Sequence, residues 1–172
     1  MNAEEIRALQ APLKARYRSE PEAALVTLRA EGRLTEGISC SVETGRALVQ
    51  AGLHPATGGT GTLACSGDLL LQALVACAGV TLNAVATALG IAVRSGTLIA
   101  EGELDFRGTL GVSKEAPVGF RAIRLTIRVD ADASPEQLAK LVELTERYCV
   151  VYQTLRGQPP LSLALEGGTA AR

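Results

Sequence analysis

Tryptophan is absent from this sequence, and aromatic residues make up only 3% of it. A chain so poor in aromatic side chains is not suited to stacking on bases or to binding carbohydrate. The chain also has no large excess of charge of one sign, because 17 basic and 18 acidic residues leave a net charge of −1. No summed positive field is therefore available to hold phosphate backbones or anionic lipid. We expect no nucleic-acid partner and no binding to membranes.

Histidine is almost absent too, since His54 is the single one. The four cysteines form no CxxC pair, so the sequence predicts no metal site, and they are too scattered for the disulfide framework of a small secreted protein. The start MNAEEIRALQ has no basic region followed by an apolar one. No P-loop or GxGxxG motif occurs, which gives no support to a nucleotide cofactor. We expect a cytoplasmic protein without a cofactor.

The composition is that of a globular domain, with 172 residues of which 47% are hydrophobic and 20% charged. No repeat, low-complexity segment or linker divides the chain. We predict a single domain over residues 1–172, with an N-terminal helix in residues 1–20, a core in 24–166 and a frayed tail in 167–172.

A long uncharged run is the most distinctive feature, because no charged residue occurs in the 25 positions from Leu69 to Val93. A run of that length is enough to cross a bilayer. Gln72, Thr81 and Asn83 dilute it, and Gly90 interrupts it, so we favour a buried helix over residues 66–89. A helix that is apolar on every side needs protein on every side. This predicts a central helix covered partly by a second subunit.

Alternating apolar residues and turn signals predict strands around that helix. Ser134, Pro135 and Gln137 form a helix N-cap with a capping box. The fold class is therefore α+β. The predicted strands are a hairpin of 24–33 and 38–49, then 91–106, 120–130 and a short last strand at 161–166.

The cysteines are the remaining candidates for chemistry, although most free cysteines are small buried hydrophobes. Cys40 alternates within a predicted strand and fits that role. Cys65 precedes the long helix, where it is either packed or a first-turn thiol with a lowered pKa. Cys77 lies inside the apolar helix, where burial makes a thiol inert. Cys149 stands where a well-capped helix should end, and the residues around it do not decide its role.

Two segments resemble one family, that of the osmotically inducible protein C and organic hydroperoxide resistance proteins. They are SGDLLLQALVACAGVTL, which contains Cys77, and TERYCVVYQTL, which contains Cys149. Between them, DFRGTLGVSKEAPVGFRAIRL is similar to the strand, loop and strand of many members. The resemblance implies curved antiparallel sheets wrapped around long central helices in an intertwined homodimer.

The resemblance also implies an activity, that of a thiol-dependent peroxidase working without metal or flavin. Cys77 would attack the peroxide and Cys149 would then close a disulfide with it. The substrate would be a small hydrophobic hydroperoxide, and an unidentified dithiol would reduce the disulfide. The rival hypothesis is a redox-silent binding or structural protein of the same fold, in which Cys77 is only packed in the core.

The family further implies an arginine, oriented by an acidic residue, that keeps the attacking thiol ionised. Asp68 falls near the position where many members have glutamate, although it fits equally a carboxylate that interacts with the helix dipole. For the arginine we favour Arg33, because AEGRL is similar to the hydroperoxide-resistance branch. Arg46 is the alternative.

Overall fold

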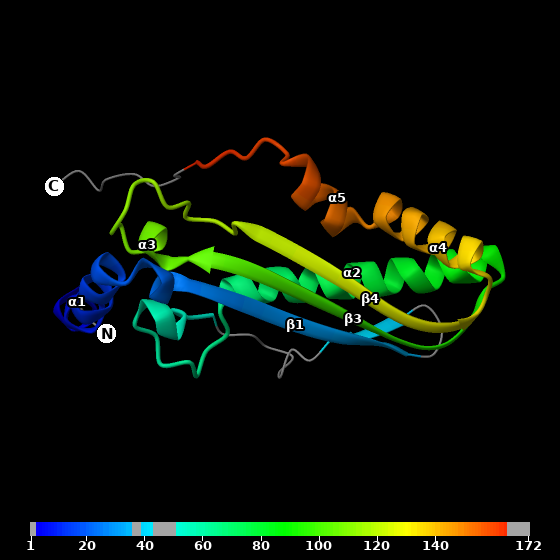
Figure 1. Ribbon diagram of the computed structural model, residues 1–172, viewed down its shortest axis with the longest axis horizontal. Coiled ribbons are helices and arrows are strands. Elements are labelled where there is room, and N and C mark those ends of the chain that lie inside the picture. Colours follow the sequence, from blue (N-terminus) through cyan, green and yellow to red (C-terminus); the bar gives the residue numbers. More distant parts are fainter. Residues whose placement is uncertain (1–2, 36–38, 43–50, 165–172) are drawn as a thin grey trace, which may run out of the picture.

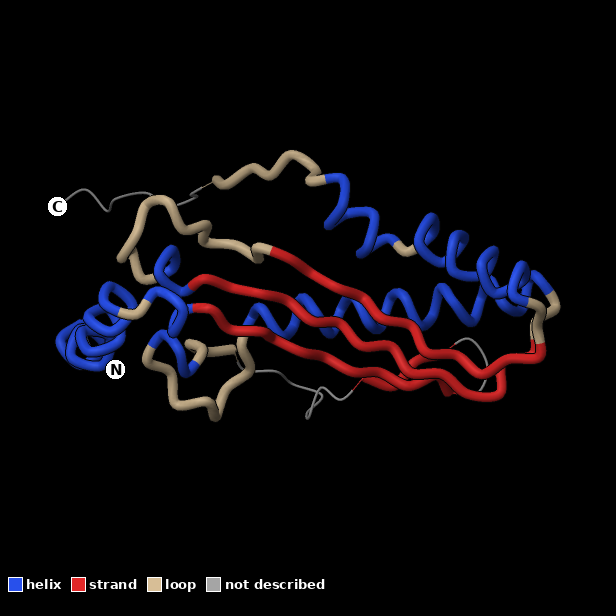
Figure 2. The backbone as a smooth tube through the Cα atoms, in the orientation of Figure 1, coloured by secondary structure: helices blue, strands red, loops and turns tan. Residues whose placement is uncertain are grey.

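The computed structural model describes the backbone of residues 3–35, 39–42 and 51–164, and the side chains of 8–27 and 51–164. A four-stranded antiparallel sheet in the order β2-β1-β3-β4 carries the helices, which confirms the α+β class. Figures 1 and 2 show the long strands running side by side. In chain order the elements are α1 (Ala3–Ser19), η1 (Pro21–Ala24), β1 (Leu25–Thr35), β2 (Ser39–Val42), η2 (Pro55–Thr57), α2 (Ser66–Leu89), β3 (Ala92–Asp105), α3 (Phe106–Thr109), β4 (Ala122–Asp132), α4 (Pro135–Tyr148) and α5 (Val150–Gly157).

The predicted hairpin is present, because β1 and β2 pair antiparallel with Leu34 opposite Cys40. The rest of the predicted second strand, at 43–49, lies outside the described residues. β1 also pairs along β3, and β3 pairs in turn with β4. A shift of register between Val93 and Ser95 marks an irregularity in the last pair. The sheet thus has β2 at one edge and β4 at the other.

Helix α2 is the central helix that the uncharged run predicts. Leu71, Leu74, Val75 and Ala78 are almost completely buried and belong to the main core cluster. Gly90 ends the helix in the left-handed conformation (φ 67°), which costs glycine nothing. By length and composition α2 is able to cross a membrane, but here it packs against the sheet, α4 and α5 as a core helix does.

One side of α2 remains uncovered in the single chain. Leu70 and Val80 are 37% and 40% exposed, and they are spaced as parts of one stripe. The stripe follows the alternating steps of four and three residues that bring two helices together in a coiled coil. Its members are Ser66, Leu70, Ala73, Cys77, Val80, Ala84 and Thr87, each exposed or half-buried.

The C-terminal part differs from the prediction in two places. The helix that begins at Pro135 ends at Tyr148 as expected, but a second helix, α5, follows after Cys149. The predicted last strand is wrong for residues 161–164, which form no strand, and residues 165–166 lie outside the described part. A strand exists only where a neighbouring strand takes up its backbone hydrogen bonds, and these residues have none.

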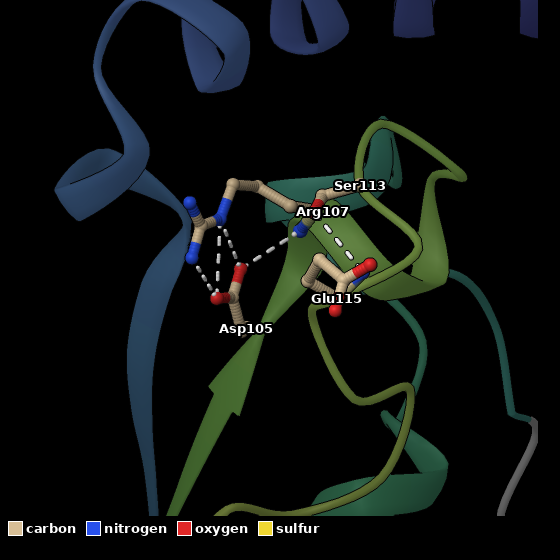
Figure 3. A network of polar contacts seen from close by, with 4 residues as sticks. All are labelled: Asp105, Arg107, Ser113 and Glu115. Carbon is tan, nitrogen blue, oxygen red and sulfur yellow. Dashed lines mark hydrogen bonds and ion pairs between the residues drawn. The ribbon is translucent and has the colours of Figure 1, made fainter.

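A buried carboxylate holds the turn from β3 into α3 (Figure 3). Asp105 is 2% exposed, accepts the backbone N–H of Arg107 at 3.1 Å and pairs with its guanidinium at 2.5 Å. The guanidinium of Arg107 keeps the pKa of Asp105 below its usual value. In the loop that follows, the hydroxyl of Ser113 accepts the backbone N–H of Glu115 at 3.3 Å. These contacts fix the path of the chain from β3 towards β4.

Replacing the capping serine tests how much local structure stabilises α4. The Ser134 hydroxyl accepts the N–H of Gln137 at 3.3 Å, and the Gln137 side chain accepts the N–H of Ser134 at 2.8 Å. We expect Ser134→Ala to lower the free energy of unfolding by about 1 kcal/mol, because one helical N–H loses its partner. Urea denaturation followed by circular dichroism measures it. Ser134→Asp should retain most of the stability, since aspartate is also a good N-cap.

Candidate functional site

The structure brings Cys77 and Cys149 together, although 72 residues separate them in the sequence. Cys77 lies in the middle of α2 and Cys149 at the junction of α4 and α5. Both are free thiols; Cys77 is half-buried, and Cys149 is 1% exposed. The thiol of Cys149 donates a hydrogen bond to the sulfur of Cys77. The two sulfur atoms are therefore direct neighbours.

The interruption at Cys149 is what creates this site. The backbone leaves the helix there (φ −72°, ψ 106°), and the N–H of Cys149 closes α4 by donating to the carbonyl of Thr145 at 3.0 Å. A new helix then starts, and the first N–H groups of a helix have no carbonyl partner inside it. The free N–H groups of Val150 and Val151 donate instead to the sulfur of Cys77.

These contacts give the Cys77 thiol the lower pKa of the two. Burial by itself raises the pKa, but hydrogen bonds from the Val151 amide, the Cys149 thiol, the Val150 amide and the Thr81 hydroxyl outweigh it. The pKa of Cys77 consequently lies below its ordinary value of 9.0. The positive end of the α5 dipole favours the thiolate in the same way. Cys77 is thus the sulfur that ionises first.

Cys149 behaves in the opposite way. The pKa of its thiol is raised to about 11, mainly by burial. The hydrogen bond to Cys77 and the charge there also raise it, while the amides of Tyr152 and Val151 lower it. A donor that gives its proton to a neighbouring thiolate is stabilised in the protonated form. The pair therefore consists of a more acidic thiol at Cys77 and a less acidic one at Cys149.

Sequence reasoning missed the groups that assist Cys77. Thr81 lies one turn later on α2, where its hydroxyl donates to the carbonyl of Cys77 at 2.8 Å and also interacts with the thiol. The amides of Val150 and Val151 carry no side-chain signature. The only available signal was the pair of β-branched residues directly after Cys149, since these continue a helix less readily than most residues.

Asp68 lies away from the two sulfur atoms. It precedes Cys77 by nine residues, which is two and a half helical turns and about 13 Å along the axis, so it occupies the opposite face of α2. Burial raises the pKa of Asp68, and the neighbouring His54 partly offsets this. The His54 ring stacks on Phe106 with centroids 5.0 Å apart. In the single chain Asp68 thus lies near His54 and not near Cys77.

The two candidate arginines are not located beside Cys77 by the described residues. The backbone of Arg33 pairs with Thr97 in β3 and with Ser41 in β2, but its side chain lies outside the described part. Arg46 lies outside it altogether. Among the side chains that are described, none of the groups that shift the pKa of Cys77 is a cation.

A small cavity of about 110 Å³ lies on the inner side of Cys149, between α2, β4 and α4. Ala78, Leu125, Ile127 and Tyr152 supply most of its apolar walls. An apolar cavity of this size takes a short hydrocarbon group. Within the described ranges no three histidine, cysteine or acidic side chains are grouped to hold a metal ion.

Comparison with known proteins identifies relatives of this arrangement. A family model described as OsmC-like protein matches residues 59–164, which include both cysteines. The chain is similar to the crystal structure of an OsmC-like hydroperoxide resistance protein from Jannaschia sp. CCS1, with 17% identity and a TM-score of 0.61 over 84% of this chain and 95% of that one. It is also similar to an OsmC-like protein from Mycoplasma pneumoniae, with 19% identity and a TM-score of 0.55 over 77% and 86% of the two chains. No curated protein matches the chain.

Proposed function

This chain belongs to the OsmC-like protein family, and we propose that it is a cysteine-based peroxidase that reduces organic hydroperoxides. The observation that carries the proposal is the direct contact of two free thiols whose pKa values shift in opposite directions, downward at Cys77 and upward at Cys149. A peroxidase of this kind needs one ionised sulfur to attack and one protonated sulfur beside it to complete the reaction. The name of the Jannaschia protein, a hydroperoxide resistance protein, agrees with this chemistry.

The reaction has two steps on the protein. The Cys77 thiolate attacks the terminal oxygen of the hydroperoxide, the O–O bond breaks, and the alkoxide leaves as an alcohol after taking a proton. Cys77 is now a sulfenic acid. The sulfur of Cys149 attacks it, its proton joins the departing hydroxyl as water, and a Cys77–Cys149 disulfide forms. A dithiol then supplies two electrons and two protons to restore both thiols.

The first helical turn of α5 has a defined role in this scheme. The amides of Val150 and Val151 donate to the sulfur of Cys77 and stabilise its negative charge before the attack. Arg33, oriented by Asp68, is the additional cation that the family resemblance suggests. Since the two cysteines lie near the exposed stripe of α2, we place that arginine in a second subunit of a homodimer.

The cavity beside Cys149 supports a hydrophobic substrate. Its apolar walls suit the hydrocarbon part of a hydroperoxide, while the peroxide oxygens need only reach the half-buried Cys77. A reducing compartment such as the cytoplasm keeps both thiols ready for reaction. The redox-silent alternative remains the competing outcome, since the same apolar core would serve a binding protein.

Mass spectrometry separates the two functions. After one equivalent of cumene hydroperoxide, the non-reduced protein should lose two hydrogens, and digestion should release a peptide that crosslinks Cys77 to Cys149. Hydrogen peroxide, which lacks the hydrocarbon part, should produce the same crosslink more slowly. An unchanged mass with either oxidant would refute the peroxidase and leave the binding protein.

A further inference from the structure

The break between α4 and α5 changes the partner of one backbone N–H group (Figure 1). In a continuous helix the N–H of Val150 would donate to the carbonyl of Glu146, four residues earlier. In this chain α4 ends at Tyr148, and the N–H of Val150 donates to the sulfur of Cys77 instead. The carbonyl of Glu146 therefore loses the partner that a continuous helix would give it.

The side chain of Gln153 takes the place of the missing N–H. Its Nε2 donates to the carbonyl of Glu146 at 2.8 Å. The backbone N–H of Gln153 donates to the carbonyl of Cys149 at 2.9 Å, so the residue is itself fixed in the first turn of α5. A side chain that enters the hydrogen-bond ladder of a helix is a known cause of a sharp change of direction. Gln153 thus binds the chain on both sides of the break.

Two acceptors are within reach of the Val150 amide, depending on the path of the chain. They are the carbonyl of Glu146, in a continuous helix, and the sulfur of Cys77, in the broken one. The sulfur of a neutral thiol is a weak acceptor compared with a carbonyl oxygen. The broken form is therefore favoured only when another donor occupies the carbonyl, because an unpaired carbonyl away from water is costly.

We propose that Gln153 is a positioning residue, which maintains the break by occupying the carbonyl of Glu146 and so leaves the amide of Val150 free for the sulfur of Cys77. It acts through the backbone of the break and not on the sulfur itself. The inference deepens the proposed function, because it rests on the role of Cys77 as the attacking sulfur.

A second contact between the two helices provides a comparison. The guanidinium of Arg156 on α5 pairs with the carboxylate of Glu146 on α4 at 2.6 Å. Both of these side chains are exposed, whereas the contact of Gln153 is partly buried. An exposed ion pair contributes little, and this one leaves the carbonyl of Glu146 untouched. We therefore expect Gln153, and not Arg156, to control the amide of Val150.

The pH dependence of iodoacetamide labelling in Gln153→Met tests the inference. Methionine has a similar length but no donor, so the Val150 amide can return to the carbonyl of Glu146. The midpoint for Cys77 should rise by about half a pH unit, which slows labelling below the midpoint roughly threefold, while the rate at alkaline pH stays that of the wild type. A side chain that only stabilised the fold would, when lost, expose Cys77 and speed its labelling at every pH. That result, or an unchanged midpoint, would overturn the inference.

Two further variants serve as controls. Arg156→Met, measured in high salt to screen exposed charges, should leave the midpoint unchanged. In the background of Val150→Pro, the substitution Gln153→Met should cause no additional shift, because proline has no N–H to return to Glu146. Equal shifts from Gln153→Met in both backgrounds, or an equal shift from Arg156→Met, would contradict the proposed role.

A second substitution at the same position keeps the test decisive if the methionine variant fails to fold. Gln153→Asn retains the amide but is one methylene too short for the carbonyl of Glu146, so it should raise the midpoint in the same way. Labelling uses no peroxide, which separates the two proposals. A raised midpoint in a protein that forms no crosslink with cumene hydroperoxide would refute the peroxidase alone, and normal crosslinking with an unchanged midpoint would refute the role of Gln153 alone.

Discussion

Cys77→Ser is expected to reduce peroxide consumption to the rate of buffer alone, whereas Cys149→Ser should consume one equivalent of hydroperoxide per chain in a fast first phase, followed only by slow overoxidation. The difference arises because breaking the O–O bond requires only the attacking sulfur of Cys77. The sulfur of Cys149 is needed afterwards, to convert the Cys77 sulfenic acid into a disulfide that a dithiol can reduce. A rapid-mixing assay of peroxide loss, with no reductant present, measures the amplitude of this first turnover.

The accompanying products distinguish the roles further. In Cys149→Ser the oxidised Cys77 should be trapped by dimedone as a sulfenic acid, and excess peroxide should drive it to the sulfinic acid. Cys65 is a half-buried cysteine outside the pair, so Cys65→Ser serves as the matched control. This variant should keep full turnover with a dithiol. A first turnover that persisted in Cys77→Ser and vanished in Cys149→Ser would reverse the assignment.

Val150→Pro should slow alkylation of Cys77 at pH 7 roughly tenfold, because it removes one of the N–H groups that stabilise the thiolate. The substitution suits this position: Val150 is the first residue of α5, where proline is favoured, and Cys149 already has the extended backbone that a following proline requires. Val150 is also 70% exposed, so little packing is lost. Iodoacetamide labelling between pH 5 and 10, read by mass spectrometry, follows the reaction.

The sign of the pH dependence follows from the direction of the pKa. Because hydrogen bonding holds the pKa of Cys77 below its ordinary value, the labelling midpoint should also lie below it, and Val150→Pro should move the midpoint to higher pH. Cys149, with a pKa of about 11, should label only at the alkaline end. Val150→Ala keeps the N–H and is the matched control. An unchanged midpoint in Val150→Pro would show that the amides do not activate the thiol.

The proposed arginine can be separated from the amides in the same assay. Arg33→Ala should raise the midpoint if a second subunit supplies the cation, with Arg46→Ala as its control, and Asp68→Asn should act in the same direction but less. If both arginine variants label like the wild type while Val150→Pro does not, the helix end is the sole source of activation.

Local patterns were enough to predict most of the helices and strands. The capping box at Ser134, the uncharged run of α2 ended by Gly90 and the alternation along β4 each involve residues close in sequence, so their preferences show without knowledge of the fold. The break after Cys149 escaped prediction. The prediction of a strand at 161–164 was wrong, because an alternating pattern forms a strand only when a neighbouring strand pairs with it, and the single chain provides none there.

For the cysteine pair, some properties follow from the sequence and others only from the tertiary structure. By itself, the sequence determined that Cys77 lies inside an apolar helix and that no metal or nucleotide motif accompanies it, and the family resemblance singled out Cys149 as its partner. Only the packing of α5 against α2 decided that the two thiols touch and that Cys77 meets free amides. Burial alone would have raised the pKa of that thiol, and the hydrogen bonds that reverse it come from backbone groups, which every residue but proline possesses and no sequence pattern marks.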